Sequence, residues 1–224
     1  MNFVHVGPHT PLPELSDKII NGKRFYKTPE GFSFPSITTI LGHEEKQAIV
    51  DWRMSLGPAK AKKETDRCSE RGSVVHELVE QFLQNKAIDL SKYKTEHTKK
   101  FVQIQTNLKK INNIRIQEEA LYSTELKIAG RVDCIAEYDG VLSVIDFKTS
   151  TNHKSKTMIQ DYYLQATAYA LMYFEMTGVL IEDIVIIMAV DNGFPLIFKE
   201  KISKYILPLQ QCIEKFYRTH QNAI

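Results

Sequence analysis

The residues best suited to chemistry lie in the stretch 130–148, which reads Gly-Arg-Val-Asp-Cys-Ile-Ala-Glu-Tyr-Asp-Gly-Val-Leu-Ser-Val-Ile-Asp-Phe-Lys. Within it Asp139-Gly140 is a preferred two-residue hairpin turn, because such turns need a positive φ at both positions. If this turn closes a hairpin, every cross-strand pair of residue numbers has the same sum, and Asp133 lies directly opposite Asp146. The spacing therefore predicts two carboxylates that face each other across a β-hairpin.

Such a pair would repel, since directly opposed Cβ atoms are ~4.5–5.5 Å apart. The repulsion is about 1 kcal/mol in water and about 3 kcal/mol at an effective dielectric constant of 20. A divalent cation such as Mg²⁺ converts the repulsion into ligation, because one or two carboxylates commonly hold it. The pattern thus indicates a metal site, although most isolated Asp-x-Lys triplets are surface pairs at polar strand ends.

Lys148 falls on the same face as Asp146, because side chains alternate along a strand. Two acids and a lysine at strand ends are what metal-assisted hydrolysis of a phosphodiester requires. The lysine would orient the attacking water or offset negative charge in the transition state.

The surrounding elements are predicted from apolar periodicity and from turn residues. They belong to one domain over 1–224, of α/β (α+β-like) class, with a central mixed sheet flanked by helices. We divide it into an N-terminal hairpin and short helix (1–45), a helical region (46–112), a sheet core with a helix (113–200) and a C-terminal helix (201–224). The expected elements are a hairpin of 23–27 with 32–34, a helix from Pro35-Ser36 to Gly42, helices over 47–56 and 59–83, strands within 114–148 punctuated by Gly130 and Asp139-Gly140, a helix over 159–176, a hairpin of 184–190 with 194–199 around Asp191-Asn192-Gly193, and a last helix with Leu209, Ile213, Phe216 and Tyr217.

Composition describes an ordinary globular protein, with 43% hydrophobic and 25% charged residues. The formal net charge of +2 neither indicates nor excludes a polyanionic partner. Three separated cysteines argue against a disulfide framework and favour a reducing compartment, and they are too few for a four-cysteine iron-sulfur cluster. No apolar run reaches the ~18 residues of a membrane helix, so we expect a cytoplasmic protein without a membrane partner.

Gly130-Arg-Val-Asp133 followed by Val144-Ile-Asp146-Phe-Lys148 resembles the bipartite signature of the RecB-like branch of the PD-(D/E)xK nucleases. Phage and mitochondrial exonucleases are members of the group that this chain resembles. Three more segments resemble motifs of these enzymes in the same order: Pro35-Ser-Ile-Thr-Thr-Ile-Leu41, Arg71-Gly-Ser-Val-Val-His76 and Gln165-Ala-Thr-Ala-Tyr169. The resemblance implies a restriction-endonuclease-like core.

The resemblance also implies roles for individual residues. Asp133 and Asp146 would ligate the metal together with the backbone carbonyl of Phe147. Lys148 would be the catalytic lysine, and His76 would be a further ligand on the facing helix. On the residues alone, a histidine beside an apolar helical stripe is more often a hydrogen-bonded boundary residue.

A further carboxylate is expected on the strand before Gly130. Glu118 and Glu119 are adjacent, and alternation lets only one of them face the site. We prefer Glu118 from its distance to Asp133. Gln165 and Tyr169 lie one helical turn apart, so they share a face and would help to orient Lys148 or the scissile phosphate, unless they are simply a helix edge.

Substrate contacts are proposed from their nearness to these motifs in sequence. Cations would contact phosphates, and aromatic side chains would stack on unpaired bases. The candidates are Arg71, Lys154 and Lys156 for phosphates, and Trp52, Tyr162 and Tyr163 for bases.

The activity implied by the resemblance is hydrolysis of DNA with Mg²⁺ or Mn²⁺ and without an iron-sulfur cluster, as an exonuclease on single strands or DNA ends. A phage or bacterial origin, and hence a bacterial cytoplasm, is suspected from the resemblance alone. Two alternatives remain open. One is a structure-specific endonuclease of the same superfamily, and the other is a catalytically inactive nuclease fold that binds nucleic acid or a protein.

Overall fold

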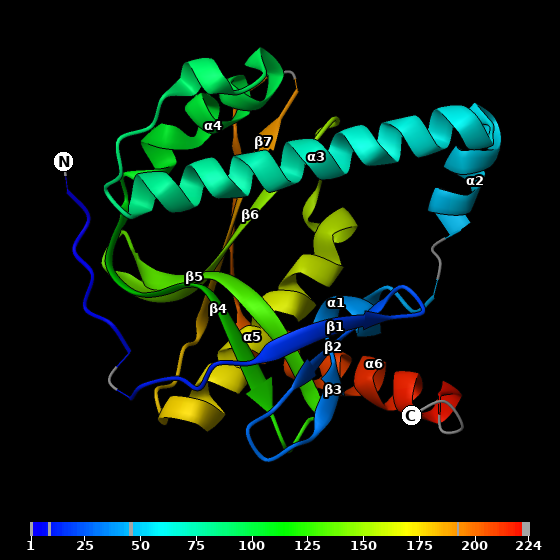
Figure 1. Cartoon of the computed structure of the whole chain (residues 1–224), viewed down its shortest axis with the longest axis vertical. Helices are drawn as coiled ribbons and strands as arrows, with labels where there is room; N and C mark the ends of the chain where they lie inside the picture. Colours follow the sequence, from blue (N-terminus) through cyan, green and yellow to red (C-terminus); the bar gives the residue numbers. More distant parts are fainter. Residues whose placement is uncertain (1, 9, 45–46, 192, 221–224) are drawn as a thin grey trace.

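The computed structural model describes residues 2–8, 10–44, 47–191 and 193–220 (Figure 1). Along the chain, an N-terminal β-sheet is followed by a helical region and then by a β-rich centre. In chain order they are β1 (Ser16–Ile20), β2 (Lys23–Lys27), β3 (Ser33–Pro35), α1 (Ile37–Leu41), α2 (Gln47–Leu56), α3 (Pro58–Leu83), η1 (Leu90–Lys92), α4 (Thr95–Leu108), β4 (Ile111–Ser123), β5 (Ile128–Tyr138), β6 (Val141–Ser150), η2 (Lys156–Ile159), α5 (Gln160–Thr177), β7 (Asp183–Val190), β8 (Leu196–Lys201), η3 (Ile202–Lys204) and α6 (Ile206–Thr219).

The strands form two sheets. The larger has the order β4-β5-β6-β7-β8, and the smaller has the order β1-β2-β3. Neighbouring strands are antiparallel except β6 and β7, which are parallel and are joined through η2 and α5. Parallel neighbours need such a crossover. The central sheet is therefore mixed and flanked by helices, which confirms the predicted fold class.

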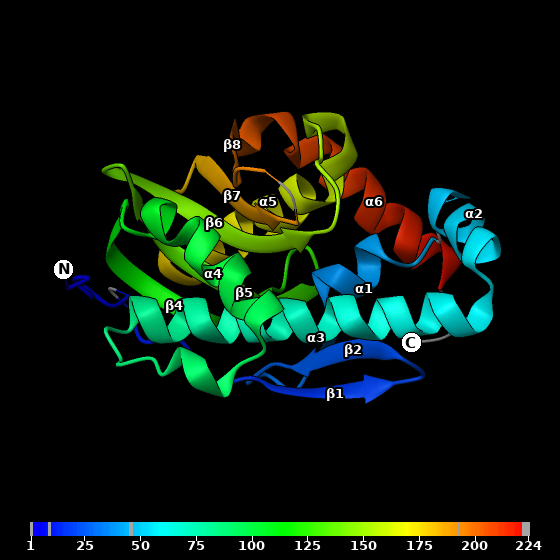
Figure 2. The ribbon, with the colours of Figure 1, turned by 90° about the horizontal axis from the view of Figure 1, so that it is seen from above.

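Helices cover both faces of the larger sheet, because its central strands are apolar on both faces. Residues 134, 136, 145 and 147 belong to a core shared with α3 and α4. Residues 132, 135, 144, 184 and 186 belong to a second core shared with α5 and α6. In Figure 2, α3 runs between the small sheet and the strands β7 and β8. The candidate chemistry thus lies on strands held between two helical layers.

The hairpin register agrees with the count made from the sequence. Tyr138 pairs with Val141, and the ladder continues to Cys134 opposite Ile145. The turn has φ values of 50° and 81° at its two central positions. The next pair in this register would be Asp133 opposite Asp146, one step beyond the last ladder pair.

Gly130 does not punctuate the strands as predicted, because it lies inside β5 and is buried. The chain instead turns at residues 124–127. The prediction took a glycine as a turn residue, whereas this glycine leaves room for a neighbour: a Cβ built on it would lie 2.9 Å from Cε1 of Tyr169.

Strand β1 was not predicted. It pairs with β2 across Asn21-Gly22, which both have positive φ. Its five residues are all exposed, so the strand gives no alternation of apolar and polar side chains to detect. Of the predicted turn Asp191-Asn192-Gly193, the middle residue lies outside the described residues. None of the helices in the described part of the chain combines the length and apolar character that crossing a bilayer requires.

Candidate active site

Asp133 stands where β5 and β6 stop pairing. Its Oδ2 accepts a hydrogen bond from the backbone N–H of Phe147 at 2.8 Å, which replaces the lost ladder contact. Its Oδ1 lies 3.5 Å from Nδ1 of His76, and its side chain is 10% exposed. The carboxylate is therefore fixed by the backbone of β6 and directed at α3.

His76 reaches the strand ends from α3. Val75, Leu78 and Val79 are buried and hold this part of the helix against the sheet. The Nε2 of His76 lies 2.7 Å from the carbonyl oxygen of Phe147. The histidine and the carbonyl that the sequence proposed as ligands are thus in direct contact.

Glu118 faces the same space. It has a positive φ of 50°, and it is skipped between the ladder pairs that Gln117 and Glu119 make with β5. This irregularity turns its carboxylate so that Oε1 lies 3.9 Å from Nδ1 of His76. Glu119 is exposed. The structure therefore brings Glu118 to Asp133, as the choice between the two acids anticipated.

These three side chains are suited to a divalent cation. One ligand atom each of His76, Glu118 and Asp133 lies within 4.8 Å of the others. Ligands on opposite sides of Mg²⁺ are about 4.2 Å apart, so a small contraction would close the group around an ion. The neighbouring Asp146 is 1% exposed, and its Oδ2 has no hydrogen-bond partner within the described part of the chain. A buried carboxylate oxygen without a partner is costly, and a cation would satisfy it.

Burial and neighbouring charges shift the pKa values of Asp146 and His76 from their ordinary values. Burial raises the pKa of Asp146, the charge of Lys148 opposes this rise, and the charge of Asp133 adds to it. Burial lowers the pKa of His76, but the carboxylates of Asp133 and Glu118 outweigh it and raise that pKa to about 9. The cluster therefore favours positive charge at its centre.

Lys148 lies beside the carboxylates on the α5 side of the sheet. Its Nζ forms an ion pair with Oδ1 of Asp146, and its side chain is 19% exposed. The same Nζ lies 5.1 Å from the centre of the Tyr162 ring on α5. Burial lowers the pKa of Lys148, but the charges of Asp146 and Asp133 outweigh this and raise it. The lysine is consequently an ammonium ion at neutral pH.

Gln165 and Tyr169 are on α5, one turn apart, as expected. The Gln165 Nε2 donates to the Tyr169 hydroxyl at 3.1 Å. Tyr169 is 2% exposed and packs on Gly130, where a Cβ would also approach Cγ2 of Ile37 to 3.2 Å. Three of the sequence motifs meet at this contact. Tyr169 thus positions α5 against β5 and α1.

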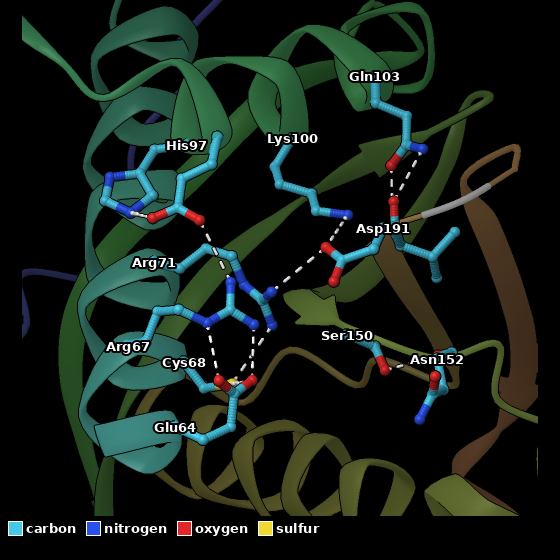
Figure 3. Close-up of polar contacts among 12 residues, drawn as sticks. Glu64, Arg67, Cys68, Arg71, His97, Lys100, Gln103, Ser150, Asn152 and Asp191 are labelled. Atoms are coloured by element: carbon cyan, nitrogen blue, oxygen red, sulfur yellow. Dashed lines mark hydrogen bonds and ion pairs between the residues drawn. The ribbon is translucent and has the colours of Figure 1, made fainter. Parts of the chain in front are cut away.

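Arg71 differs from its expected place on a DNA-binding surface. Its side chain is 2% exposed, and Nη1 lies 3.3 Å from Oδ1 of Asp191 (Figure 3). Lys100, from α4, reaches the same Oδ1 at 2.7 Å and is 7% exposed. A guanidinium so enclosed does not reach an external phosphate. We therefore correct the interpretation: Arg71 ties α3 to the end of β7.

The sequence indicated Asp191 only as a turn residue, not as the partner of two buried cations. Its backbone N–H donates to the carbonyl of Ser150, which joins the ends of β7 and β6. On one side of it, Gln103 from α4 bonds both the N–H and the carbonyl of Val190. A single aspartate after an apolar strand gives no signal of such a role, because its partners are distant in sequence.

Among the other proposed substrate contacts, Tyr163 is buried, whereas Trp52, Lys154 and Lys156 are at least partly exposed. Tyr163 is fully buried and stacks on Tyr205 at 4.9 Å, so it is not available to a base. Trp52 is 37% exposed on α2. Lys156 is largely exposed and bonds Glu200 at 2.8 Å, and Lys154 lies in the same segment before α5.

Several known proteins are similar to this chain in sequence. The sequence profile of the PD-(D/E)XK nuclease superfamily matches residues 50–189. The human mitochondrial genome maintenance exonuclease 1 is 28% identical over 205 residues, which cover 81% of this chain and 58% of the human protein. The mouse protein of that name is 28% identical over 204 residues, covering 82% and 60%, and that of Xenopus tropicalis is 32% identical over 150 residues, covering 61% and 42%.

Among solved structures, one from Eubacterium rectale covers 70% of this chain and 68% of its own, with a TM-score of 0.48 and 11% identity. The chain spans 58% of the length of the human relative that it matches.

Proposed function

Because this chain belongs to the PD-(D/E)XK nuclease superfamily, we propose that it hydrolyses DNA as a divalent-metal-dependent exonuclease acting on single strands or DNA ends. The observation that carries the proposal is the convergence of His76, Glu118 and Asp133 within 4.8 Å, beside the buried pair of Asp146 and Lys148. The relatives named as exonucleases support the choice of an exonuclease.

The protein would supply the ligands and the electrostatics of the reaction. Asp133, Asp146 and Glu118 would hold a cation, with the Phe147 carbonyl and His76 completing the set. Mg²⁺ or Mn²⁺ is proposed because carboxylate and carbonyl oxygens are the ligands that these ions prefer. Such an ion, when bound, polarises a phosphate oxygen and lowers the pKa of a water molecule.

Lys148 would act on the reacting phosphate. Its ammonium would orient the attacking water and offset the negative charge that develops on the phosphate oxygens. Gln165 and Tyr169 would act at a distance by holding α5 in register with β5. Lys154, Lys156 and Trp52 are proposed as contacts along the strand, with the cations binding phosphates and the Trp52 ring stacking on bases. The Tyr162 ring faces the Nζ of Lys148, so stacking on a base is not proposed for it.

The proposal is tested by digesting 5′-labelled and 3′-labelled single- and double-stranded DNA with Mg²⁺ or with EDTA, beside the variants Asp146→Ala and Lys148→Ala. We expect stepwise loss of nucleotides from ends with Mg²⁺ and none with EDTA. Folded variants that degrade DNA as fast as the parent would refute the site. A closed circular single strand separates the two nuclease classes, because an enzyme that requires ends leaves it intact whereas an endonuclease cuts it.

A catalytically inactive nuclease fold is the other alternative. It predicts that a charged residue of the set has been lost, whereas Asp133, Asp146 and Lys148 are all present. We also propose that the protein acts in the cytoplasm. The free thiols of Cys68, Cys134 and Cys212 support a reducing compartment.

A further inference from the structure

We propose that Tyr162 is a positioning residue that holds the Lys148 ammonium in its working place through the face of its ring. The inference rests on the proposed function, since it assigns Tyr162 a part in that reaction. The Nζ of Lys148 lies 5.1 Å from the ring centre. A cation within about 6 Å of an aromatic centroid is attracted by the negative face of the ring.

Lys148 needs the contact with the Tyr162 ring because its other partner, Asp146, is also a proposed metal ligand. Asp146 pairs with Nζ through Oδ1, and both side chains are largely enclosed, at 2% and 19% exposed. The same carboxylate is a proposed metal ligand. Once it binds a cation, part of its charge is neutralised, and the cation itself repels the ammonium. The ion pair therefore weakens in the state in which Lys148 has to work.

The contact between the Tyr162 ring and Lys148 is not weakened in this way when a cation binds. The attraction comes from the face of the ring, which is not a ligand of Mg²⁺, so a bound cation does not compete with Lys148 for it. The ring also packs against the apolar core shared with α5 and α6, and this packing helps to fix its position. The contact between ring and ammonium should therefore persist when Asp146 turns to a metal.

The position of Tyr162 on α5 explains why this tyrosine contacts Lys148. Tyr162, Gln165 and Tyr169 have i, i+3 and i+7 spacing and share one face of the helix. Gln165 and Tyr169 bond to each other, and Tyr169 is enclosed against Gly130. Lys148 is therefore contacted by Tyr162, the N-terminal residue of this face. Tyr162 would thus share the role of orienting Lys148 that the sequence proposed for Gln165 and Tyr169.

The test is steady-state hydrolysis of single-stranded DNA with Mg²⁺ by the parent and by Tyr162→Phe, Tyr162→Trp, Tyr162→Leu and Tyr162→Met. Phe and Trp keep the ring, and we expect their kcat to stay within about twofold of the parent. Leu and Met keep apolar packing without the ring, and we expect kcat to fall about five- to thirtyfold with KM nearly unchanged. Thermal midpoints identify any variant that does not fold.

A direct contact of Tyr162 with a base is separated by DNA binding in the Lys148→Met background. If the ring acts through Lys148, adding Tyr162→Leu there leaves affinity for single-stranded DNA unchanged. A loss of affinity in that background, or a higher KM at an unchanged kcat, means stacking on a base and overturns the proposal. Equal kcat for all folded variants also overturns it, whereas an inactive parent refutes the proposed function instead.

Discussion

The carboxylate of Asp133 accepts a hydrogen bond from the backbone N–H of Phe147, with 2.8 Å between Oδ2 and N. The regular ladder between β5 and β6 ends one pair earlier. One side chain therefore closes the hairpin with one oxygen and points the other at His76. The strand end and the candidate metal site are built by the same residue, which leads to a prediction that separates the two roles.

Asp133→Asn and Asp133→Ala should both lose nuclease activity, because neither supplies a negative charge to a cation. They should differ in stability. Asparagine still offers an oxygen to the Phe147 N–H, whereas alanine leaves that buried donor unpaired, at a cost of about 1–3 kcal/mol. Urea unfolding of both variants measures the difference. Equal stabilities would show that the hydrogen bond to Phe147 contributes nothing.

Gly130→Ala should destabilise the protein by about 1–3 kcal/mol, because the new Cβ would overlap Tyr169 and crowd Ile37. Gly72→Ala is the matched control. That glycine lies within α3, and among the described residues a Cβ added to it would meet no heavy atom of a neighbouring element within 4 Å. Alanine should therefore stabilise the helix by about 1 kcal/mol. Thermal unfolding compares the pair, and a neutral Gly130→Ala would contradict the close approach of α5 to β5.

The hairpin could be predicted because its information is local. The turn Asp139-Gly140 fixes the register by chain geometry, and five ladder pairs follow from it. The function of Gly130 could not be predicted in the same way, because its neighbour Tyr169 is remote in sequence. The strand β1 was missed although Asn21-Gly22 is a strong turn signal, since all its side chains are exposed.

Asp191→Ala should cost at least about 2 kcal/mol, because it leaves the enclosed cations Arg71 and Lys100 without their shared carboxylate. The value lies below that of a fully buried pair, since Asp191 is 29% exposed. Asp66→Ala is the control: it breaks an exposed pair with Lys62 and should change stability by less than about 0.5 kcal/mol. Chemical unfolding decides, and equal effects would mean that the cluster does not tie α3 to β7.

Mg²⁺ alone should raise the thermal midpoint of the parent by about 5–10 °C at a hundredfold excess over its dissociation constant. Glu118→Gln keeps the shape of the side chain and removes its charge, so its shift at the same concentration should be smaller. Glu119→Gln removes the charge of the exposed neighbour and should behave as the parent. The opposite ranking would assign the ligand to Glu119.

The choice of Glu118 over Glu119 from the sequence rested on its distance to Asp133, after strand alternation had limited the site to one of the two acids. In the structure Glu118 itself has a positive φ, and this turns its side chain toward the site. The regular alternation of a strand does not describe such a residue. The burial of Arg71 could not be predicted from the sequence either. The sequence around a cation looks the same whether that cation contacts DNA or an internal aspartate. Local geometry was thus predictable, while long-range pairing of charges was not.

The central claim is that Asp133 and Asp146 hold one cation between them. It is tested most directly by a crystal structure of the protein with Mn²⁺, located by its anomalous scattering. We predict one peak within about 2.0–2.2 Å of an oxygen of each carboxylate, with Glu118 and the Phe147 carbonyl on its other sides. A catalytically active protein whose Mn²⁺ lies beyond the reach of either aspartate would contradict the account.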